Sequence, residues 1–462
     1  MFRKSFFKEF CRAAAVALLL SLIAMFAVSC GCLEIFEQDT LTKEELYENI
    51  SKDQTEKATV AHHLYDWDFP QFNTNKLMYV ESLVSQNFYK EMKDKLTLAN
   101  SCAQLFLAYF YDNIDLENET AVTDALLKCY MKSIGDDYAA YRVPSEQEVF
   151  NGEISGGASF VGIGVQVRNT EEGLPYITAV YGESGAASAG ILPKDVITSV
   201  DGRSSSEIGY QAAMDALKGE AGSFVQVGIL RGDERLVLNV ERKLLQETSV
   251  CYYLDAETSY GYVHIMAFQK TTGTEFKAAI DYLEAVGAKG IVFDLRNNLG
   301  GLLSAVKEVV SYLVEDGLRF LSVDGYNIEE EIDRTLADHH EVNLPIVVLV
   351  NEYTASAAEI FASALRDYRD HPELGAKNNN ITIVGKKTYG KGVMQSSYSM
   401  KDGSAVTFTT AYYNPPSGVN YHGVGVYPDE GYEVDPRYTI YGDAQLSRAY
   451  EALDEFFVLA AA

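Results

Sequence analysis

The sequence predicts a multidomain α/β protein with an N-terminal helical segment, a β-rich middle domain and an α/β core. Three observations predict this organisation. The chain of 462 residues is longer than one hydrophobic core usually organises. Short β-type runs separated by glycines fill residues 160–242. After residue 260, runs with the spacing of strands alternate with runs with the spacing of helices, which is typical of an α/β fold.

The domain boundaries follow from these patterns and from the composition of the two ends. They are an export signal at 1–29, a tether and N-terminal helical region at 30–97, a helical segment at 98–154, the middle domain at 155–244, the core at 245–440 and a C-terminal helix at 441–462. The formal net charge of −28 excludes nucleic acid as an expected partner, because the phosphate backbone would be repelled.

The first 32 residues have the pattern of a targeting segment. Four basic residues precede an apolar run at 13–28: Arg3, Lys4, Lys8 and Arg12. The apolar run is short for a spanning helix but suits the core of a signal peptide. The residues Ala27 to Cys30 then resemble a bacterial lipoprotein processing site, in which Cys30 would carry the lipid. Alanine at 27 departs from the usual leucine, so simple cleavage and an uncleaved N-terminal anchor remain alternatives. All three predict an exported protein, and the lipoprotein interpretation places it at the outer face of the cytoplasmic membrane.

Cysteine and histidine spacing gives no metal site. Beyond the signal the thiols are scattered, with no CxxC pair: Cys102, Cys129 and Cys251. They are expected to be buried side chains, and one bridge between Cys102 and Cys129 is left open. The histidine pairs at 62–63 and 339–340 lack HExxH spacing, which disfavours a zinc protease. No metal and no organic cofactor is expected.

Residues 30–154 are predicted to be mainly helical. The stretch 34–57 is charged and polar and suits a tether, and 67–95 has amphipathic spacing. From Leu98 onward, apolar residues at helical spacing predict two helices that end near 134–138. Helix packing is the expected role of this segment.

The middle domain resembles a PDZ domain in the order of its strands and helices. A strand and glycine turn at 160–165 precede a strand at 176–180, a short helix at 185–189, a strand at 195–200 and a helix at 211–217. By this resemblance an extended peptide adds to the domain as a strand, with its terminal carboxylate bound by backbone N–H groups. The groove residues are expected to be Val161, Gly162, Ile163, Gly164, Ala213 and Leu217. A PDZ-like fold kept only as a spacer or lid is the alternative.

Two positions depart from the usual PDZ pattern. The turn at 184–186 lacks a common proline, and Lys194 occupies a position where glycine usually precedes Asp195. Neither position lies on the groove strand.

The core begins with alternating strands and helices. Strands are predicted at 260–265 and 290–295, a helix between them at 274–286, and a further helix at 302–313. The turn at 296–301 contains Gly300 and Gly301, and a glycine pair allows a backbone N–H to approach a ligand closely. Taken alone, this turn is also an ordinary helix entry.

A serine and a lysine in the core have patterns that suit acyl-transfer chemistry. A strand at 344–350 and a tight turn precede Ser356, which begins a helix, so unpaired N–H groups and the helix dipole lie beside its hydroxyl. Lys391 lies between two glycines after a strand at 381–384. Burial would lower the pKa of this amine and allow it to act as a base without histidine. The alternatives are a helix N-cap and a solvated surface lysine.

The strings 354–360 and 388–395 together resemble the Ser/Lys site of the C-terminal processing peptidases, also called tail-specific proteases. The resemblance extends from about Leu98 to Asp429. It implies that Ser356 is the nucleophile, Lys391 the general base and Gln395 the residue that orients the lysine. It assigns the oxyanion hole to the N–H groups of Gly300 and Ala357, with Gly301 as the fallback for the first.

The resemblance implies an exported serine endopeptidase that cuts proteins near their C termini and recognises free, apolar tails through its PDZ domain. A membrane link through the N terminus and a homodimer are further expectations. A catalytically silent PDZ adaptor is the alternative function. It predicts loss of Ser356, Lys391 or Gln395, and none is lost. A penicillin-interacting acyltransferase would require lysine at 359, where the chain has glutamate.

Overall fold

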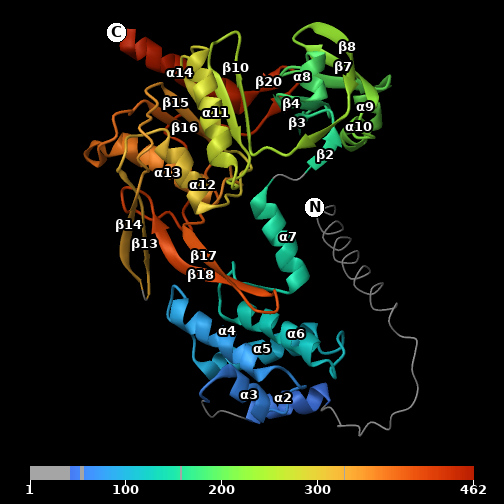
Figure 1. Cartoon of the computed structure of the whole chain (residues 1–462), viewed down its shortest axis with the longest axis vertical. Helices are drawn as coiled ribbons and strands as arrows, with labels where there is room; N and C mark the ends of the chain where they lie inside the picture. The colour runs from blue at the N-terminus through green and yellow to red at the C-terminus, as the bar shows by residue number, and fades with distance from the viewer. Residues whose placement is uncertain (1–41, 53–56, 157–158, 327, 462) are drawn as a thin grey trace.

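The computed structural model describes residues 42–52, 57–156, 159–326 and 328–461. The predicted export signal and Cys30 lie outside the described residues. Figure 1 shows N-terminal helices at one end of the molecule and the α/β core and PDZ-like domain at the other, with strands β17 and β18 between them. Among the described helices, none is long and apolar enough to cross a bilayer. The predicted multidomain α/β architecture is confirmed.

Five helices form the N-terminal segment: α2 (Lys43–Lys52), α3 (Val60–Asp66), α4 (Thr74–Asn87), α5 (Lys95–Tyr109) and α6 (Glu119–Ser133). The side chains of four N-cap residues accept hydrogen bonds from the first turns of α3 to α6: Thr59, Asn73, Asp94 and Asn118. The buried faces of these helices form one core around Trp67, Phe106 and Tyr130, which also includes Val406 and Phe408 of β18. The N-terminal helices are therefore packed onto the β17/β18 hairpin.

The PDZ-like domain follows β1 (Ala140–Arg142) and α7 (Pro144–Ser155). Its elements are β2 (Ser159–Gly162), β3 (Val165–Asn169), β4 (Pro175–Val180), α8 (Gly185–Ala189), β5 (Val196–Val200), β6 (Arg203–Ser204), α9 (Ser205–Ile208), α10 (Tyr210–Leu217), β7 (Phe224–Arg231), β8 (Glu234–Glu241) and β9 (Lys243–Gln246). The main sheet has the order β3-β4-β5-β7-β8, whereas β2 and β9 form a separate two-stranded ribbon. The chain thus enters and leaves the domain through adjacent strands.

The core sheet has the order β10-β11-β12-β15-β16, and every pair except β10/β11 is parallel. Its strands are β10 (Val250–Leu254), β11 (Gly261–Ile265), β12 (Ile291–Asp294), β15 (Ile346–Val350) and β16 (Ile381–Gly385). Helices α11 (Thr272–Ala285), α12 (Leu303–Ser311) and α13 (Ala357–Asp370) cover one face. Helix α14 (Ala444–Ala461) covers the other. Apolar residues alternate between the two faces, as in a sheet buried on both sides.

A second sheet of five strands connects the core to the N-terminal helices. It has the order β1-β18-β13-β14, with β17 paired to the same strand β18. Its further strands are β13 (Arg319–Gly325), β14 (Ile328–Arg334), β17 (Val393–Ser399) and β18 (Ala405–Asn414). Short elements complete the chain: η1 (Pro372–Leu374), β19 (Tyr438–Thr439) and β20 (Gly442–Asp443).

Lys194 has a structural role that its sequence position did not suggest. Its φ of 75° lies in the left-handed region, which favours the glycine usually found there. Its ammonium group forms an ion pair with Asp255 of the core and lies over the ring of Tyr450 in α14. Arg437 and Glu171 form a second ion pair between the C-terminal segment and the PDZ-like domain. The PDZ-like domain is therefore docked on the core at positions away from the β2/β9 ribbon.

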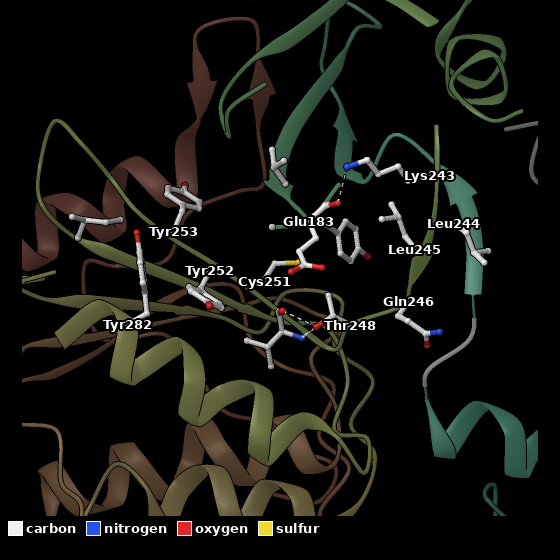
Figure 2. A pocket seen from close by; sticks show the side chains of 15 residues that line it. Glu183, Lys243, Leu244, Leu245, Gln246, Thr248, Cys251, Tyr252, Tyr253 and Tyr282 are labelled. Atoms are coloured by element: carbon white, nitrogen blue, oxygen red, sulfur yellow. Dashed lines mark hydrogen bonds between the residues drawn. The ribbon is translucent and has the colours of Figure 1, made fainter. Parts of the chain in front are cut away.

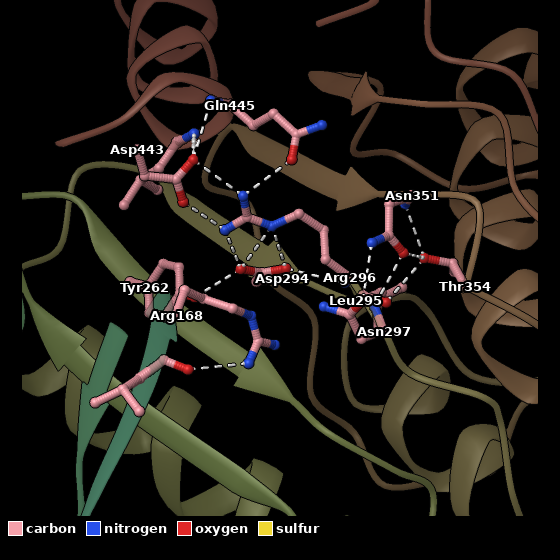
Figure 3. Close-up of polar contacts among 12 residues, drawn as sticks. Arg168, Tyr262, Asp294, Leu295, Arg296, Asn297, Asn351, Thr354, Asp443 and Gln445 are labelled. Atoms are coloured by element: carbon pink, nitrogen blue, oxygen red, sulfur yellow. Dashed lines mark hydrogen bonds and ion pairs between the residues drawn. The ribbon is translucent and has the colours of Figure 1, made fainter. Parts of the chain in front are cut away.

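Arg296 is the centre of a buried ionic cluster that joins the core sheet to the start of α14 (Figure 3). Its guanidinium donates three hydrogen bonds to Asp294, of 2.9, 3.1 and 2.6 Å, and two to Asp443, of 3.1 and 2.8 Å. A further bond of 3.0 Å reaches Gln445. Arg296 is only 3% exposed, so both carboxylates depend on it for charge compensation.

Replacing Arg296 with methionine is expected to destabilise the protein by about 3–5 kcal/mol, because two buried carboxylates lose their cation. The measurement is the urea midpoint of unfolding followed by circular dichroism. Arg437→Met is the matched control, since both partners of that ion pair are more than half exposed, at 62% and 57%. It is expected to cost about 1 kcal/mol or less. Equal midpoints for Arg296→Met and wild type would contradict the prediction.

Candidate active site

Ser356 lies at the turn that joins β15 to α13, at the carboxyl end of the parallel sheet. Its backbone angles are φ 57° and ψ −121°, an unfavourable conformation for a residue with a side chain. As the N-cap residue it lies directly before Ala357, the first residue of the helix. The strained turn therefore presents the serine hydroxyl beside the N-terminus of α13, where negative charge is stabilised.

Backbone N–H groups suited to an oxyanion lie around this turn. Among the hydrogen bonds of the described residues, none uses the N–H of Ala357. Gly300 packs against the same turn, since a Cβ added to it would lie 2.7 Å from Cβ of Ser356 and 2.9 Å from N of Ala357. However, the N–H of Gly300 donates to Oδ1 of Asn298 at 2.8 Å. Within the described ranges the N–H of Gly301, the fallback residue, has no such partner.

Lys391 is partly buried in a loop that requires glycine on both sides. A Cβ on Gly392 would lie 2.8 Å from Oδ1 of Asn420, and one on Gly390 would lie 3.1 Å from N of Gly425. Burial lowers the pKa of the Lys391 amine, while the negative charges of Asp136 and Glu359 oppose this shift. The amine therefore has the environment expected of a base, and not that of a solvated surface lysine.

The structure brings the Ser356 turn and the Lys391 loop together through Glu359. This fully buried carboxylate accepts hydrogen bonds from N of Ser356 at 2.9 Å, N of Lys391 at 2.7 Å, N of Gly390 at 2.6 Å and Oγ1 of Thr388 at 2.5 Å. Burial raises the pKa of Glu359, and these four donors lower it in part. The sequence pattern did not predict this role of Glu359, which served there only to exclude another enzyme class.

Tyr413 of β18 makes a second link between the two segments. Its hydroxyl donates to the backbone carbonyl of Lys391 and lies near the side chain of Ser356. Burial raises the pKa of this phenol, and the contact with Ser356 opposes the shift. No spacing in the sequence indicated this contact of Tyr413.

Gln395, the predicted partner of Lys391, lies on β17 at an irregularity in the pairing with β18. Its amide donates to the carbonyl of Val393 at 3.3 Å and to Oγ1 of Thr409 at 3.2 Å. The side chain is thus fixed beside the lysine loop by its neighbours on the hairpin.

The predicted groove residues of the PDZ-like domain fall into two groups. Ile163, Ala213 and Leu217 are buried in the core of the domain. Val161 and Gly162 belong to β2 and pair with Leu244 and Lys243 of β9. Gly164 has a φ of 82°, and a Cβ there would lie 2.2 Å from Cβ of Ser184. Of the described hydrogen bonds, none engages the N–H of Ile163 or Gly164, which leaves both donors available for a carboxylate.

Cavities lie on both sides of the junction between the PDZ-like domain and the core. One of about 680 Å³ lies between β9 and the edge strand β10, and Figure 2 shows Tyr252 and Tyr282 at its core side. Another, of about 290 Å³, is lined by Gln166 to Arg168 of β3 and by His264, Arg296 and Asn297 of the core. The second cavity connects the groove strand to the turn that leads to Gly300.

Across the described ranges, no group of three or more His, Cys, Asp or Glu side chains is arranged to bind a metal ion. The residues around Ser356 instead provide a hydroxyl, a buried amine and backbone donors, which is the set that acyl transfer needs.

Comparison with known proteins identifies both the α/β core and the PDZ-like domain. Residues 259–432 match peptidase family S41, and residues 161–241 match the PDZ domain. The chain is 30% identical over 348 residues to the carboxy-terminal processing protease CtpA of Bacillus subtilis, covering 75% of this chain and 71% of that protein. It is 31% identical over 314 residues to a probable CtpA-like serine protease of Staphylococcus haemolyticus, covering 68% of this chain and 60% of that protein.

A solved structure shows the same fold. It is that of a putative S41 protease from Bacteroides fragilis, with 15% sequence identity and a TM-score of 0.52. The alignment covers 82% of this chain and 97% of the other.

Proposed function

The chain belongs to the C-terminal processing serine peptidases of family S41, and we propose that it is an exported endopeptidase that cuts proteins near free, apolar C termini. Ser356 is the nucleophile and Lys391 the general base. The observation that carries this proposal is the meeting of the Ser356 turn and the Lys391 loop at Glu359 and Tyr413. Two segments from different parts of the core are thereby held in one site.

The reaction follows from the environment of each group. Neutral Lys391 accepts the proton of Ser356 as Oγ attacks a peptide carbonyl, and the resulting ammonium then protonates the leaving amine. The N–H of Ala357, with that of Gly300 or Gly301, stabilises the oxyanion. Because Gly300 donates to Asn298 in this structure, its participation requires that bond to be released, whereas Gly301 is available without a change. Water hydrolyses the acyl-enzyme with Lys391 again acting as the base.

Substrate selection is assigned to the PDZ domain. An extended tail added beside β3 places its carboxylate near the N–H groups of Ile163 and Gly164. The cavity of about 290 Å³ between β3 and the Arg296–Asn297 turn supports a path from this groove to the catalytic residues. The PDZ domain is then the part of the enzyme that reads the substrate end.

The export and membrane parts of the proposal rest on the N-terminal sequence. Basic residues before the apolar run at 13–28, followed by Cys30, support a lipid-anchored protein on the outer face of the cytoplasmic membrane. Cleavage without lipid and an uncleaved anchor predict different masses for the mature N-terminal peptide, so mass spectrometry of the membrane fraction decides among them. A homodimer is part of the same proposal, and light scattering of the purified protein tests it.

The central experiment compares cleavage of an unfolded protein that ends in an apolar tail with cleavage of the same protein amidated at its C terminus. Wild type is expected to cut the free tail, and amidation is expected to lower kcat/KM about tenfold or more, because a charge-assisted contact is lost. Ser356→Ala is expected to cut neither substrate. Cleavage by Ser356→Ala would refute the site, and equal cleavage of both substrates would refute carboxylate capture. An inert wild type would favour the adaptor function.

A further inference from the structure

We propose that the turn at 135–138, which ends the N-terminal helical segment, completes the catalytic site, with Asp136 and Tyr138 as positioning residues for Lys391. This inference rests on the proposed function, in which Lys391 is the general base. Helix packing was the expected role of this segment. The structure instead places two of its side chains beside the reactive amine, although they precede it by some 250 positions in the sequence.

The aromatic ring of Tyr138 packs against the amine of Lys391. The Nζ atom of Lys391 lies 4.5 Å from the centre of the Tyr138 ring, within the range of a cation–π interaction. The phenol of Tyr138 lies near Tyr389, two residues before the lysine, and this neighbour adds to the burial that raises its pKa. The face of the ring is therefore directed at the position where positive charge appears.

Asp136 connects the same turn to the catalytic hairpin. Its buried carboxylate accepts hydrogen bonds from N of Thr409 at 2.7 Å, Oγ1 of Thr409 at 3.0 Å and N of Tyr138 at 3.0 Å. The same Oγ1 of Thr409 accepts from the amide of Gln395 at 3.2 Å. Asp136 thus orients the Tyr138 backbone and, through Thr409, the side chain of Gln395 on the strand that follows Lys391.

The surrounding fold holds this turn firmly in place. Strand β1 begins two residues after Tyr138 and pairs with β18 from Ala140 to Arg142. The helices before the turn share one hydrophobic core with Val393, Val406 and Phe408 of the hairpin. The N-terminal helical segment is therefore continuous with the catalytic site and is not a separate appendage.

Asp136 and Tyr138 affect the positive charge that Lys391 acquires during the reaction. When Lys391 accepts the serine proton it becomes an ammonium ion in a largely dry site, which is costly without compensation. The Tyr138 ring face and the Asp136 carboxylate stabilise that ion and therefore the transition state in which it forms. Four other titratable groups surround this position: Glu359 of α13, Tyr389 of the lysine loop, Tyr413 of β18 and His422 of the loop after β18. Lys90 faces Asp136.

The first test measures the protonation of Lys391 directly and needs no catalysis. In Ser356→Ala protein, the pH dependence of Lys391 acylation by acetic anhydride is followed by mass spectrometry of the Lys391 peptide. Asp136→Asn and Tyr138→Leu are expected to shift the midpoint down by about 0.5–1 pH unit, because each removes a group that stabilises the ammonium form. Tyr138→Phe keeps the ring face and is expected to leave the midpoint within about 0.2 pH unit of the parent.

The second test measures activity with Ser356 intact. The acidic limb of the pH profile of kcat/KM is expected to shift down in Asp136→Asn and Tyr138→Leu by the same amount as the labelling midpoint, and kcat to fall about tenfold. Tyr109→Leu, an exposed tyrosine of α5 in the same helical segment, is the control for a general effect on that segment. Its profile is expected to match wild type.

Unchanged labelling midpoints in Asp136→Asn and Tyr138→Leu proteins with wild-type circular dichroism would overturn the inference. A shift in Tyr138→Phe as large as that in Tyr138→Leu would also overturn the role of the ring face. Both outcomes differ from failure of the proposed function, which would appear as cleavage by Ser356→Ala or as an inert wild type, with the labelling result unaffected.

Discussion

Replacing Lys391 with methionine is expected to lower kcat/KM about 10⁴-fold while the protein stays folded, because the serine loses its proposed general base and the leaving amine its proton donor. Methionine fills nearly the same apolar space, so burial is kept. Lys391→Arg is expected to be equally inactive at every pH tested. A guanidinium remains protonated under these conditions and accepts no proton from Ser356.

The control for this pair is Lys387→Met, on the same loop. Lys387 is exposed and lies over the ring of Tyr427, with Nζ 5.5 Å from the ring centre, so the substitution removes an equal charge outside the site. Its kcat/KM is expected to stay within about twofold of wild type. The measurement is steady-state cleavage of the free-tailed substrate from pH 6 to 10. Activity above a tenth of wild type in Lys391→Arg would contradict the assignment of the base.

Replacing Glu359 with glutamine is expected to lower kcat/KM about 10²-fold and also to reduce stability. All four groups bonded to this side chain are donors, and one oxygen accepts from the N–H groups of Ser356 and Lys391. Glutamine keeps the shape but turns one acceptor atom into a donor, so at least one buried N–H group loses its partner whichever way the amide is oriented. The strained Ser356 turn and the lysine loop then lose the contact that fixes their positions relative to each other.

The measurement combines steady-state kinetics with the urea midpoint. Glu352→Gln is the matched control, because Glu352 is exposed on the turn just before Ser356 and the change in charge is the same. It is expected to leave both quantities near wild type. A Glu359→Gln enzyme within threefold of wild type in kcat/KM would show that the backbone alone fixes the site.

The fold was predicted well wherever local pattern decides structure. Strand β15, the turn and helix α13 around Ser356 appear at the expected positions. Strand β14 was not predicted, because its sequence IEEEIDR has little apolar alternation and is a strand only through pairing with β13. Tertiary pairing of this kind leaves no local signal.

The proposed pairing of Ser356 with Lys391 was predictable from motifs, but the residues that join the motifs were not. Glu359 and Tyr413 act through bonds between segments that are distant in sequence, and no spacing rule reveals such bonds. Asp136 and Tyr138 had the pattern of a helix end. Their nearness to Lys391 depends on how the N-terminal helices pack onto β17 and β18. Lys194, a departure from the PDZ pattern, acquires its ion pair only when the domains dock.

The β2/β9 ribbon has a consequence for how this enzyme can evolve. Because Ser159 pairs with Gln246, the two ends of the PDZ domain are neighbours, and the chain enters and leaves this inserted domain at one place. Such an insert can be exchanged, shortened or duplicated by recombination without redirecting the chain on either side. If the PDZ domain selects the substrate, as proposed above, that choice and the peptide-cutting chemistry can diverge separately, the first by changes between residues 159 and 246 and the second by changes elsewhere.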